Sequence, residues 1–391
     1  MQKPNVLFIS SWYPSKEHET LGNFVQRHAE AINPFVNLWV LAVTSSSELE
    51  EEFQLEYSAI NGVNTLHVYY QKVNSTIPIL SSAKKLSRYR EAYNVGKKFL
   101  TEEKGMTTID VIHCNVTFPA GIYALDCKKK HKIPYLLTEH WTLFLPYKNE
   151  FKKLNPLVKH KMKEIVANAS RVVPVSEHLS TSMQEKGMKG SYTVIPNVAD
   201  TQLFSLRTKQ PTEIKQLLHV STLVDDHKNI SGIFRTLRKI AETRQDFHLV
   251  IVTDGDIEKA KFLQKSVGLQ DRYVTYHGTK TPQEIAHFYQ SSDFFVLFSN
   301  YENLPVVMVE SLCCGLPFIS SNVGGISEFI NESNGCLVEP KDEESLWEKI
   351  NFMLDNLENF DSKTIRESAV SQFDNSVVGS RYLEIYKEIV S

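Results

Sequence analysis

Cysteine is scarce in this sequence, with five residues among 391, an odd number without regular spacing. Secreted domains that depend on disulfides carry many cysteines in even numbers, so this pattern predicts a protein of a reducing compartment. Cysteine-bound metal needs several thiols at short repeated spacings, which the adjacent pair Cys313 and Cys314 does not supply. We therefore expect thiols that pack in the interior and no cysteine-bound metal.

Long hydrophobic runs are also absent. No apolar stretch approaches the roughly 20 residues that a helix needs to span a bilayer. The apolar part of residues 1–10 is too short for a signal peptide and predicts a strand. The sequence therefore predicts a cytoplasmic protein.

Neither sign of charge dominates, since the formal net charge is −3. The distribution is uneven, because residues 1–200 hold 24 lysines and arginines against 19 acidic residues, and residues 201–391 hold 19 against 27. Basic clusters occur at residues 84–90, 128–132 and 151–163. They can be solvated helix faces, or they can attract anionic lipid headgroups, where each basic residue adds about 1 kcal/mol.

The second interpretation predicts peripheral contact with an anionic membrane, at its inner face, and the aromatic and basic stretch 141–163 motivates it. Nucleic acid is not an expected partner, because the chain is acidic overall and no recognition motif accompanies the clusters.

A chain of 391 residues exceeds the usual size of one core, so two domains are expected. Both halves alternate apolar strands with helical patterns, which is typical of doubly wound parallel α/β sheets. Strands are predicted at residues 6–10, 38–43, 111–113, 135–138 and 171–175, then at 216–220, 248–252, 274–277, 293–298 and 317–320. The aperiodic segment 197–212 predicts the linker, and 377–390 predicts a final helix. Ligands of such folds bind at the carboxyl ends of the strands.

Two glutamates eight positions apart, Glu302 and Glu310, are the most informative residues. The apolar run 293–298 before them predicts a buried strand. Pro305 suits the first turn of a helix, and Gly315 suits its end. One carboxylate is thus predicted in a strand-to-helix loop and the other about two turns inside the helix.

Backbone N–H groups between Asn303 and Val306 lie at this predicted helix start, which is an anion site. A carboxylate beside such a site accepts hydrogen bonds from hydroxyl groups, and paired sugar hydroxyls fit its two oxygens. Phosphate at the helix start with carboxylates beside it describes a pocket for a sugar nucleotide.

The run 299–328 resembles family 4 of the retaining glycosyltransferases, which have the GT-B fold. The family pattern is Glu-x7-Glu, then a small residue with Gly-x-Pro, then Gly-Gly-x-x-Glu. Here the two glutamates are followed by Cys314-Gly315-Leu316-Pro317 and by Gly324-Gly325-Ile326-Ser327-Glu328. Weaker matches extend from Ser11-Trp12-Tyr13-Pro14 to the final helix.

The resemblance implies two Rossmann-like domains facing a cleft. The predicted parts are an acceptor-binding domain over residues 1–200, a domain for the nucleotide sugar over 201–375, and a helix over 376–391 that crosses back onto the first domain.

The resemblance also implies roles for the motif residues. Glu310 is expected to accept hydrogen bonds from the ribose, and Glu302 to face the donor sugar. The segment beside the sugar hydroxyls and the distal phosphate consists of Asn303, Leu304, Pro305 and Val306. Such enzymes transfer with retention and usually without a protein nucleophile, and the leaving phosphate is thought to take the acceptor's proton. Stabilising charge on the diphosphate is then the protein's main electrostatic task.

In the family that task belongs to an arginine and a lysine after the first strand of the second domain. Lys228 occupies the lysine position, but Thr222 stands where the arginine is expected. A threonine hydroxyl donates a hydrogen bond without bringing charge. Three alternatives follow from the missing arginine. Lys228 alone stabilises the diphosphate, a basic residue of the first domain supplies the second charge, or the enzyme has weakened activity.

Asp254-Gly255-Asp256 follows a predicted strand where the family has a glycine-rich loop. A D-x-D triplet binds metal in another glycosyltransferase fold, but this position predicts a turn at Gly255 near the nucleotide. Gly278 and Thr279 follow the next strand and resemble the loop that holds the nucleobase. We expect neither a metal nor another cofactor.

In the first domain, the segment around Gly22 resembles the family's glycine loop, which approaches the donor diphosphate or the acceptor. His140 matches a family histidine near the reacting sugar, where a neutral imidazole donates to a hydroxyl. A packed structural histidine is the alternative.

Together these residues predict a retaining, metal-independent hexosyltransferase that uses a nucleotide sugar, with UDP as the expected nucleotide. The expected acceptor is a glycan or lipid-linked glycan in polysaccharide or glycoconjugate biosynthesis. The alternatives are a sugar-nucleotide epimerase of the same fold, which lacks the Glu-x7-Glu pair, and a non-catalytic binder of nucleotide sugars, motivated by Thr222.

Overall fold

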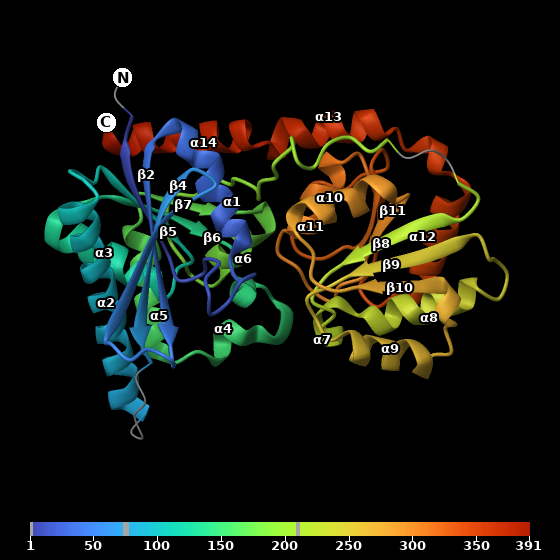
Figure 1. Cartoon of the computed structure of the whole chain (residues 1–391), viewed down its shortest axis with the longest axis horizontal. Coiled ribbons are helices and arrows are strands. Elements are labelled where there is room, and N and C mark those ends of the chain that lie inside the picture. Colours follow the sequence, from blue (N-terminus) through green and yellow to red (C-terminus); the bar gives the residue numbers. More distant parts are fainter. Residues whose placement is uncertain (1–2, 73–77, 209–211) are drawn as a thin grey trace. The chain divides into compact units, whose positions relative to one another are not determined.

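The computed structural model describes residues 3–72, 78–208 and 212–391 (Figure 1). The chain forms two compact units. Unit 1 consists of Met1–Val198 together with Asn375–Ser391, and unit 2 of Ala199–Asp374. The last helix therefore belongs to unit 1, although it follows unit 2 in the sequence.

A seven-stranded sheet forms the centre of unit 1. Its strands are β1 (Asn5–Ser10), β2 (Asn37–Ser46), β3 (Phe53–Ile60), β4 (Val63–Gln71), β5 (Val111–Asn115), β6 (Tyr135–Glu139) and β7 (Arg171–Pro174). Their order is β3-β4-β2-β1-β5-β6-β7. The pairings are parallel except that of β3 with β4, which is antiparallel.

The helices of unit 1 are α1 (Asn23–Ile32), α2 (Pro78–Glu103), α3 (Ala120–His131), α4 (Glu150–Lys153), α5 (Pro156–Asn168), α6 (Glu177–Glu185) and α14 (Asn375–Val390). Side chains alternate between the two faces of a strand. On β2, accordingly, Val40 joins the core beneath α1 and α14, whereas Leu41 contacts Gly96 of α2. Helices therefore cover both faces, as the prediction of a doubly wound sheet requires.

The hairpin of β3 and β4 was not predicted. Its turn is Asn61-Gly62, and both residues have positive φ, 49° and 78°. Asn-Gly between two strands is a strong local signal for a two-residue hairpin turn, so the sequence carried this information. The prediction of strands by apolar runs failed because β3 is only partly buried and polar residues interrupt it.

Unit 2 is built on a six-stranded parallel sheet with the order β10-β9-β8-β11-β12-β13. The strands are β8 (Lys215–Val220), β9 (Phe247–Val252), β10 (Val274–His277), β11 (Phe294–Leu297), β12 (Phe318–Ser321) and β13 (Gly335–Val338). Five were predicted. The missing one, β13, has four residues and begins with glycine, which gives little signal.

Helices of unit 2 are α7 (Asp225–Lys228), α8 (Ile230–Ile240), α9 (Ile257–Ser266), α10 (Pro282–Ser291), α11 (Val306–Cys313), α12 (Glu343–Asp355) and α13 (Ser362–Phe373). Helix α11 ends at Cys313, and Gly315 just after its cap has a φ of +70°; a Cβ there would lie 2.2 Å from the Ser362 carbonyl oxygen. The predicted end of this helix is therefore correct, and glycine is required by both conformation and space.

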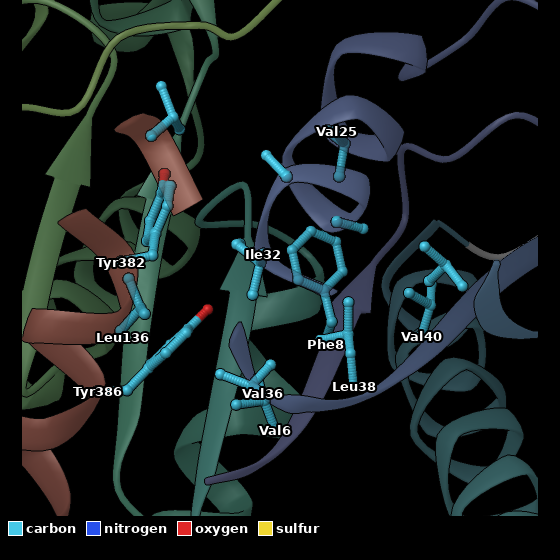
Figure 2. Packing of buried hydrophobic residues seen from close by; sticks show 14 of the residues in the cluster. Val6, Phe8, Val25, Ile32, Val36, Leu38, Val40, Leu136, Tyr382 and Tyr386 are labelled. Atoms are coloured by element: carbon cyan, nitrogen blue, oxygen red, sulfur yellow. The ribbon is translucent and has the colours of Figure 1, made fainter. Parts of the chain in front are cut away.

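Helix α14 completes the core of unit 1. Its apolar face packs against α1 and the sheet, and Figure 2 shows Tyr382 and Tyr386 among the core side chains. The Tyr386 hydroxyl lies 2.6 Å from Nδ1 of the buried His113, and the Tyr382 hydroxyl lies 3.1 Å from Oγ1 of Thr138. Gly379 allows close approach, since a Cβ there would lie 2.1 Å from the Ala31 carbonyl oxygen.

Parallel pairing aligns the carboxyl ends of the strands at one edge of each sheet. The loops that follow β8, β9, β10, β11 and β12 therefore share one edge of unit 2, and those that follow β1, β5 and β6 share one edge of unit 1. No helix in the described part of the chain has the length and apolar character needed to cross a bilayer.

Candidate functional site

Glu302 and Lys228 form a buried ion pair at the carboxyl edge of unit 2. Glu302 lies in the loop between β11 and α11, and Lys228 ends α7, which follows β8. The Lys228 ammonium lies 2.5 Å from Oε1 of Glu302, and the two side chains are only 12% and 7% exposed. The hydroxyl of Ser299 also donates to this oxygen at 2.7 Å. The residue predicted to face the donor sugar and the lysine predicted at the diphosphate are thus in direct contact.

Glu302 is held ionised in this position. Burial by itself raises the pKa of a carboxyl group, but the charge of Lys228, followed by His227, outweighs burial and lowers the pKa of Glu302 to about 2. The carboxylate can therefore accept hydrogen bonds from hydroxyl groups at any pH near neutrality. Lys228 has three N–H donors, so the pair leaves donors for a second anionic group.

His227 is a neighbour that the sequence analysis missed. Its Nε2 lies 3.5 Å from Oε1 of Glu302, and its ring stacks on Tyr301 with centroids 4.2 Å apart. The backbone N–H of Asn300 donates to the His227 carbonyl oxygen at 2.8 Å, which joins the two loops. The sequence signal that could have predicted this neighbour is that His227 directly precedes Lys228.

Glu310 is the fifth residue of α11, so it lies just over one turn inside the helix rather than two turns. The helix begins later than expected, because Pro305 is its N-cap instead of a residue of its first turn. Glu310 is 4% exposed, and the hydroxyl of the buried Tyr289 donates to its Oε2 at 2.8 Å. Tyr289 thus orients this carboxylate, a role that the sequence analysis did not assign.

The residues between the two glutamates form a tightly packed loop. Asn303, Leu304 and Pro305 are buried, and Val306 is half-buried. The Asn303 carbonyl oxygen accepts a 2.8 Å hydrogen bond from the N–H of Gly325. Gly324 has a φ of +60°, and a Cβ on it would lie 2.1 Å from the Glu302 carbonyl oxygen. The Gly-Gly motif therefore supports the loop that carries Glu302.

The other predicted residues of unit 2 lie at the same edge. Thr222 is exposed after β8, and Gly255 follows β9. A Cβ on Gly255 would lie 1.9 Å from the Thr222 carbonyl oxygen, so the two loops touch. Gly278 and Thr279 are exposed after β10. These residues lie at one edge of the sheet, as a shared pocket requires. Their individual roles in binding stay predictions.

The Asp-Gly-Asp triplet has a local structural use. Oδ1 of Asp256 accepts a 3.0 Å hydrogen bond from the Lys259 N–H and caps α9. Among the described residues, no group of three or more histidine, cysteine, aspartate or glutamate side chains is arranged to hold a metal ion.

Gly22 and His140 lie at the carboxyl edge of unit 1. Gly22 caps α1 with a φ of +78°, and a Cβ on it would lie 2.3 Å from the Trp12 carbonyl oxygen. The rings of His140 and Phe24 are 4.8 Å apart, and those of Trp12 and Trp141 are 5.7 Å apart. The glycine loop and the loop after β6 therefore meet, with both tryptophans half-buried.

His140 is 7% exposed and lies beside His28, with ring centroids 5.2 Å apart. Burial, and then the neighbouring His28 and His113, lower the pKa of His140 well below its ordinary value. The imidazole is therefore neutral near pH 7, as its predicted role requires and as a packed structural histidine would also be.

Glu139 fixes the backbone at His140. This carboxyl group is completely buried, and its Oε1 accepts hydrogen bonds from the N–H groups of His140 and Trp141, both at 2.8 Å. Its Oε2 accepts from the N–H and the hydroxyl of Thr117. Burial raises the pKa of Glu139 above its ordinary value against these hydrogen bonds. The sequence did not predict a role for Glu139, although it directly precedes His140.

Comparison with known proteins covers both units. Residues 36–203 match the family model described as Glycosyltransferase Family 4, and residues 214–356 match the one described as Glycosyl transferases group 1. The putative teichuronic acid biosynthesis glycosyltransferase TuaC of Bacillus subtilis is 26% identical, over 88% of each chain.

Two solved structures share the fold. Sucrose-phosphate synthase of Thermosynechococcus elongatus superposes with a TM-score of 0.77 at 19% identity, over 99% of each chain. Anabaena HepE in complex with UDP and glucose superposes with a TM-score of 0.70 at 16% identity, over 98% of this chain and 100% of HepE.

Proposed function

Because this chain belongs to family 4 of the glycosyltransferases and has the GT-B fold, we propose that it transfers a hexose-type sugar with retention from a UDP-sugar. The proposed acceptor is a glycan or a lipid-linked glycan in polysaccharide or glycoconjugate biosynthesis. The name of TuaC supports this class of acceptor, and the UDP complex of HepE supports the nucleotide.

The observation that carries the proposal is the contact of Lys228 with Glu302, in the loop that leads into the helix holding Glu310. Glu302 accepts hydrogen bonds from the hydroxyl groups of the donor sugar, while Lys228 directs its remaining N–H donors at the diphosphate. Charge develops on the diphosphate as the glycosidic bond breaks, so a preorganised ammonium group stabilises the transition state more than the ground state.

We assign the ribose to Glu310. The Tyr289 hydroxyl donates to Oε2 and orients the carboxylate towards the hydroxyl groups of the ribose. His227, whose Nε2 lies 3.5 Å from Oε1 of Glu302, is a further side chain beside the site where Thr222 replaces the expected arginine.

The acceptor is assigned to unit 1, at the edge where Gly22, Trp12 and Trp141 meet. Half-buried tryptophan rings offer apolar faces on which sugar rings stack, and His140 supplies a neutral donor. In this scheme the chain contributes no nucleophile, and the leaving phosphate takes the proton of the acceptor hydroxyl on the same face of the sugar.

Nucleotide binding by Glu310→Ala tests the proposal. UDP, bound to the native protein, should raise the melting temperature by mass action, and GDP should raise it less. Loss of the charged acceptor should weaken UDP binding by about 1.5–3 kcal/mol, roughly 10- to 150-fold. Glu339→Ala, at an exposed glutamate of unit 2, is the control. Equal UDP affinity in the Glu310 variant and the native protein would refute the ribose assignment.

The type of reaction needs a second measurement. Product analysis by NMR with a UDP-sugar and a panel of acceptors should show the anomeric configuration of the donor preserved. Donor binding without transfer or hydrolysis would instead support the non-catalytic binder, and conversion of the sugar nucleotide to its epimer would support the epimerase.

A further inference from the structure

A surface pocket of about 990 Å³ lies at the amino edge of the sheet in unit 1, where β1, β2 and β4 begin. The segment 105–110 after α2 and Val390 at the end of α14 also line it, and we call it the amino-edge pocket. Strand β1 has six residues, so about 20 Å separates this pocket from the carboxyl edge that holds Gly22 and His140. The pocket is therefore distinct from the proposed acceptor site.

Three asparagines begin neighbouring strands at this edge: Asn5 of β1, Asn37 of β2 and Asn64 of β4. Asparagine is disfavoured in strands, so formation of the sheet does not explain them. In the parallel register Asn5 lies opposite Asn37, and Trp39 lies opposite Asn64. Their neighbours along the strands belong to the core beneath α1: Val6, Leu38, Val40 and Val63. Because side chains alternate, the three amides and the indole ring of Trp39 lie on the other face of the sheet.

Hydrogen bonds hold these amides in place. The side-chain N–H of Asn5 donates to Oδ2 of Asp110 at 3.0 Å, and that of Asn37 donates to Oδ1 of Asn5 at 3.1 Å. The Tyr57 hydroxyl donates to Oδ1 of Asn64 at 3.0 Å. Within the described residues, Oδ1 of Asp110 accepts no hydrogen bond and the side-chain N–H groups of Asn64 donate none. The network thus presents a fixed acceptor and fixed donors that a ligand can use.

The lining of the pocket favours a neutral ligand rich in hydroxyl groups. Amides both donate and accept hydrogen bonds, and a carboxylate accepts from paired hydroxyls. The half-buried ring of Trp39 offers an apolar face on which a sugar ring can stack. The charged lining residues are Asp110 and Lys3, one of each sign, so the pocket prefers neither anions nor cations. A purely apolar ligand would leave the amides without partners, which costs free energy.

We propose that the amino-edge pocket is a second saccharide-binding site, which takes a short segment of a neutral glycan. One sugar ring stacks on Trp39, and its hydroxyl groups bind Asn37, Asn64 and Asp110. The volume of the pocket is within the range of small-molecule sites. A glycan held here can stay attached to the protein between successive transfers, and only this consequence rests on the proposed function.

Saturation-transfer NMR of the full chain tests the site. The probes are neutral trisaccharides built from glucose, galactose, mannose or N-acetylglucosamine, and at least one of them should bind the native chain. Trp39→Ala should weaken its binding roughly tenfold or more by removing the stacking surface. Asn37→Ala should weaken it about fivefold by removing one hydrogen-bonding group. Asn37 is exposed, so this second variant is expected to fold whatever the effect of Trp39→Ala on stability.

Two controls match these changes in unit 2. Trp347→Ala removes another half-buried indole, and Asn359→Ala removes another exposed amide. Both controls should bind the trisaccharide with native affinity.

Fluorescence places the bound sugar. The chain has four tryptophans, so Trp12→Phe, Trp141→Phe and Trp347→Phe together leave Trp39 as the single emitter and also alter the proposed acceptor site. The trisaccharide should shift the emission of this chain. A chain that keeps Trp347 as its single tryptophan should give no shift.

Three outcomes would overturn the proposal. They are no binding of any trisaccharide by the native chain, equal affinity in Asn37→Ala and Asn359→Ala, and no emission shift from Trp39. Loss of binding in Trp141→Ala, with native binding in Trp39→Ala, would place the sugar at the acceptor edge instead. UDP should stabilise the Trp39 and Asn37 variants as it does the native protein, which separates failure of this site from failure of the proposed function.

Discussion

Glu302 is a carboxylate with only 6% of its surface exposed, and such a group is stable only when partners replace the water it has lost. Lys228, Ser299 and His227 are these partners. The sequence predicted the lysine and the glutamate as members of one site but not that they contact each other. It did not predict His227 beside Glu302, because that contact depends on two loops meeting.

The ion pair predicts a pH dependence of stability. The pKa of Glu302 is about 2 in the folded protein, against an ordinary value of 4.5, so the unfolded chain binds a proton first as the pH falls. The resulting stabilisation is fully present above about pH 4.5 and is lost as the pH falls towards 2. Urea unfolding of unit 2 across this range should therefore show a smaller acid-induced loss for Glu302→Gln than for the native protein.

Glu358→Gln, at an exposed glutamate of unit 2, should keep the native pH profile. Lys228→Met should destabilise unit 2 at pH 7 by about 3 kcal/mol, because it leaves a buried carboxylate without its main counter-charge. Parallel pH profiles for Glu302→Gln and the native protein would show that this carboxylate is not held ionised by its partners.

At the scale of elements, the site depends on how loops of different strands support one another. The loop after β12 reaches the loop after β11 through Gly324 and Gly325, and the loop after β9 reaches that after β8 through Gly255. Backbone atoms approach within distances that exclude a Cβ. Gly324 and Gly325 therefore support the loop that carries Glu302.

Gly324→Ala should displace the Glu302 loop. Its positive φ costs an alanine about 1–2 kcal/mol, and the contact with the Glu302 carbonyl oxygen adds to this. We expect the free energy of unfolding of unit 2 to fall by more than about 2 kcal/mol and UDP binding to weaken.

Gly278→Ala is the matched control for stability, since no atom lies within 4 Å of its added Cβ. Its free energy of unfolding should stay near the native value. If Gly324→Ala were as stable as Gly278→Ala, the glycine would not be needed to support the loop.

At the scale of the whole molecule, the chain leaves unit 1 at Val198 and returns to it at Asn375. Helix α14 supplies Val378, Tyr382, Ile385 and Tyr386 to the core of unit 1. The first and last parts of the sequence are therefore one folding unit, and unit 2 is inserted between them.

Truncation after Asp374 should destabilise unit 1 and spare unit 2. It uncovers the apolar face of α1 and removes the hydroxyl partner of the buried His113, so a loss of several kcal/mol is expected. Hydrogen exchange followed by mass spectrometry should show lost protection in β1 and α1, with native protection in β8 and β11. An equal loss of protection in both units, or no loss in either, would contradict the assignment of α14 to unit 1 alone.

Much of this protein followed from local sequence alone. The strands of apolar residues, the end of α11 near Gly315 and the spacing of Glu302 and Glu310 were correctly predicted, because each depends on near neighbours in the chain. The predicted family and GT-B fold were also confirmed. They could be predicted because the order of the motifs along the chain is kept where overall sequence identity is low. Even the missed hairpin had a local signal at Asn61-Gly62.

Tertiary structure alone decided which distant residues meet. The 2.5 Å contact of Lys228 with Glu302, the hydroxyl of Tyr289 on Glu310 and the tyrosines of α14 on His113 and Thr138 join residues far apart in sequence. Such contacts arise from strand order and from loops converging at one edge of a sheet, which no local pattern encodes. The residue types in the site were thus set by the sequence, and their charge balance was set by the fold.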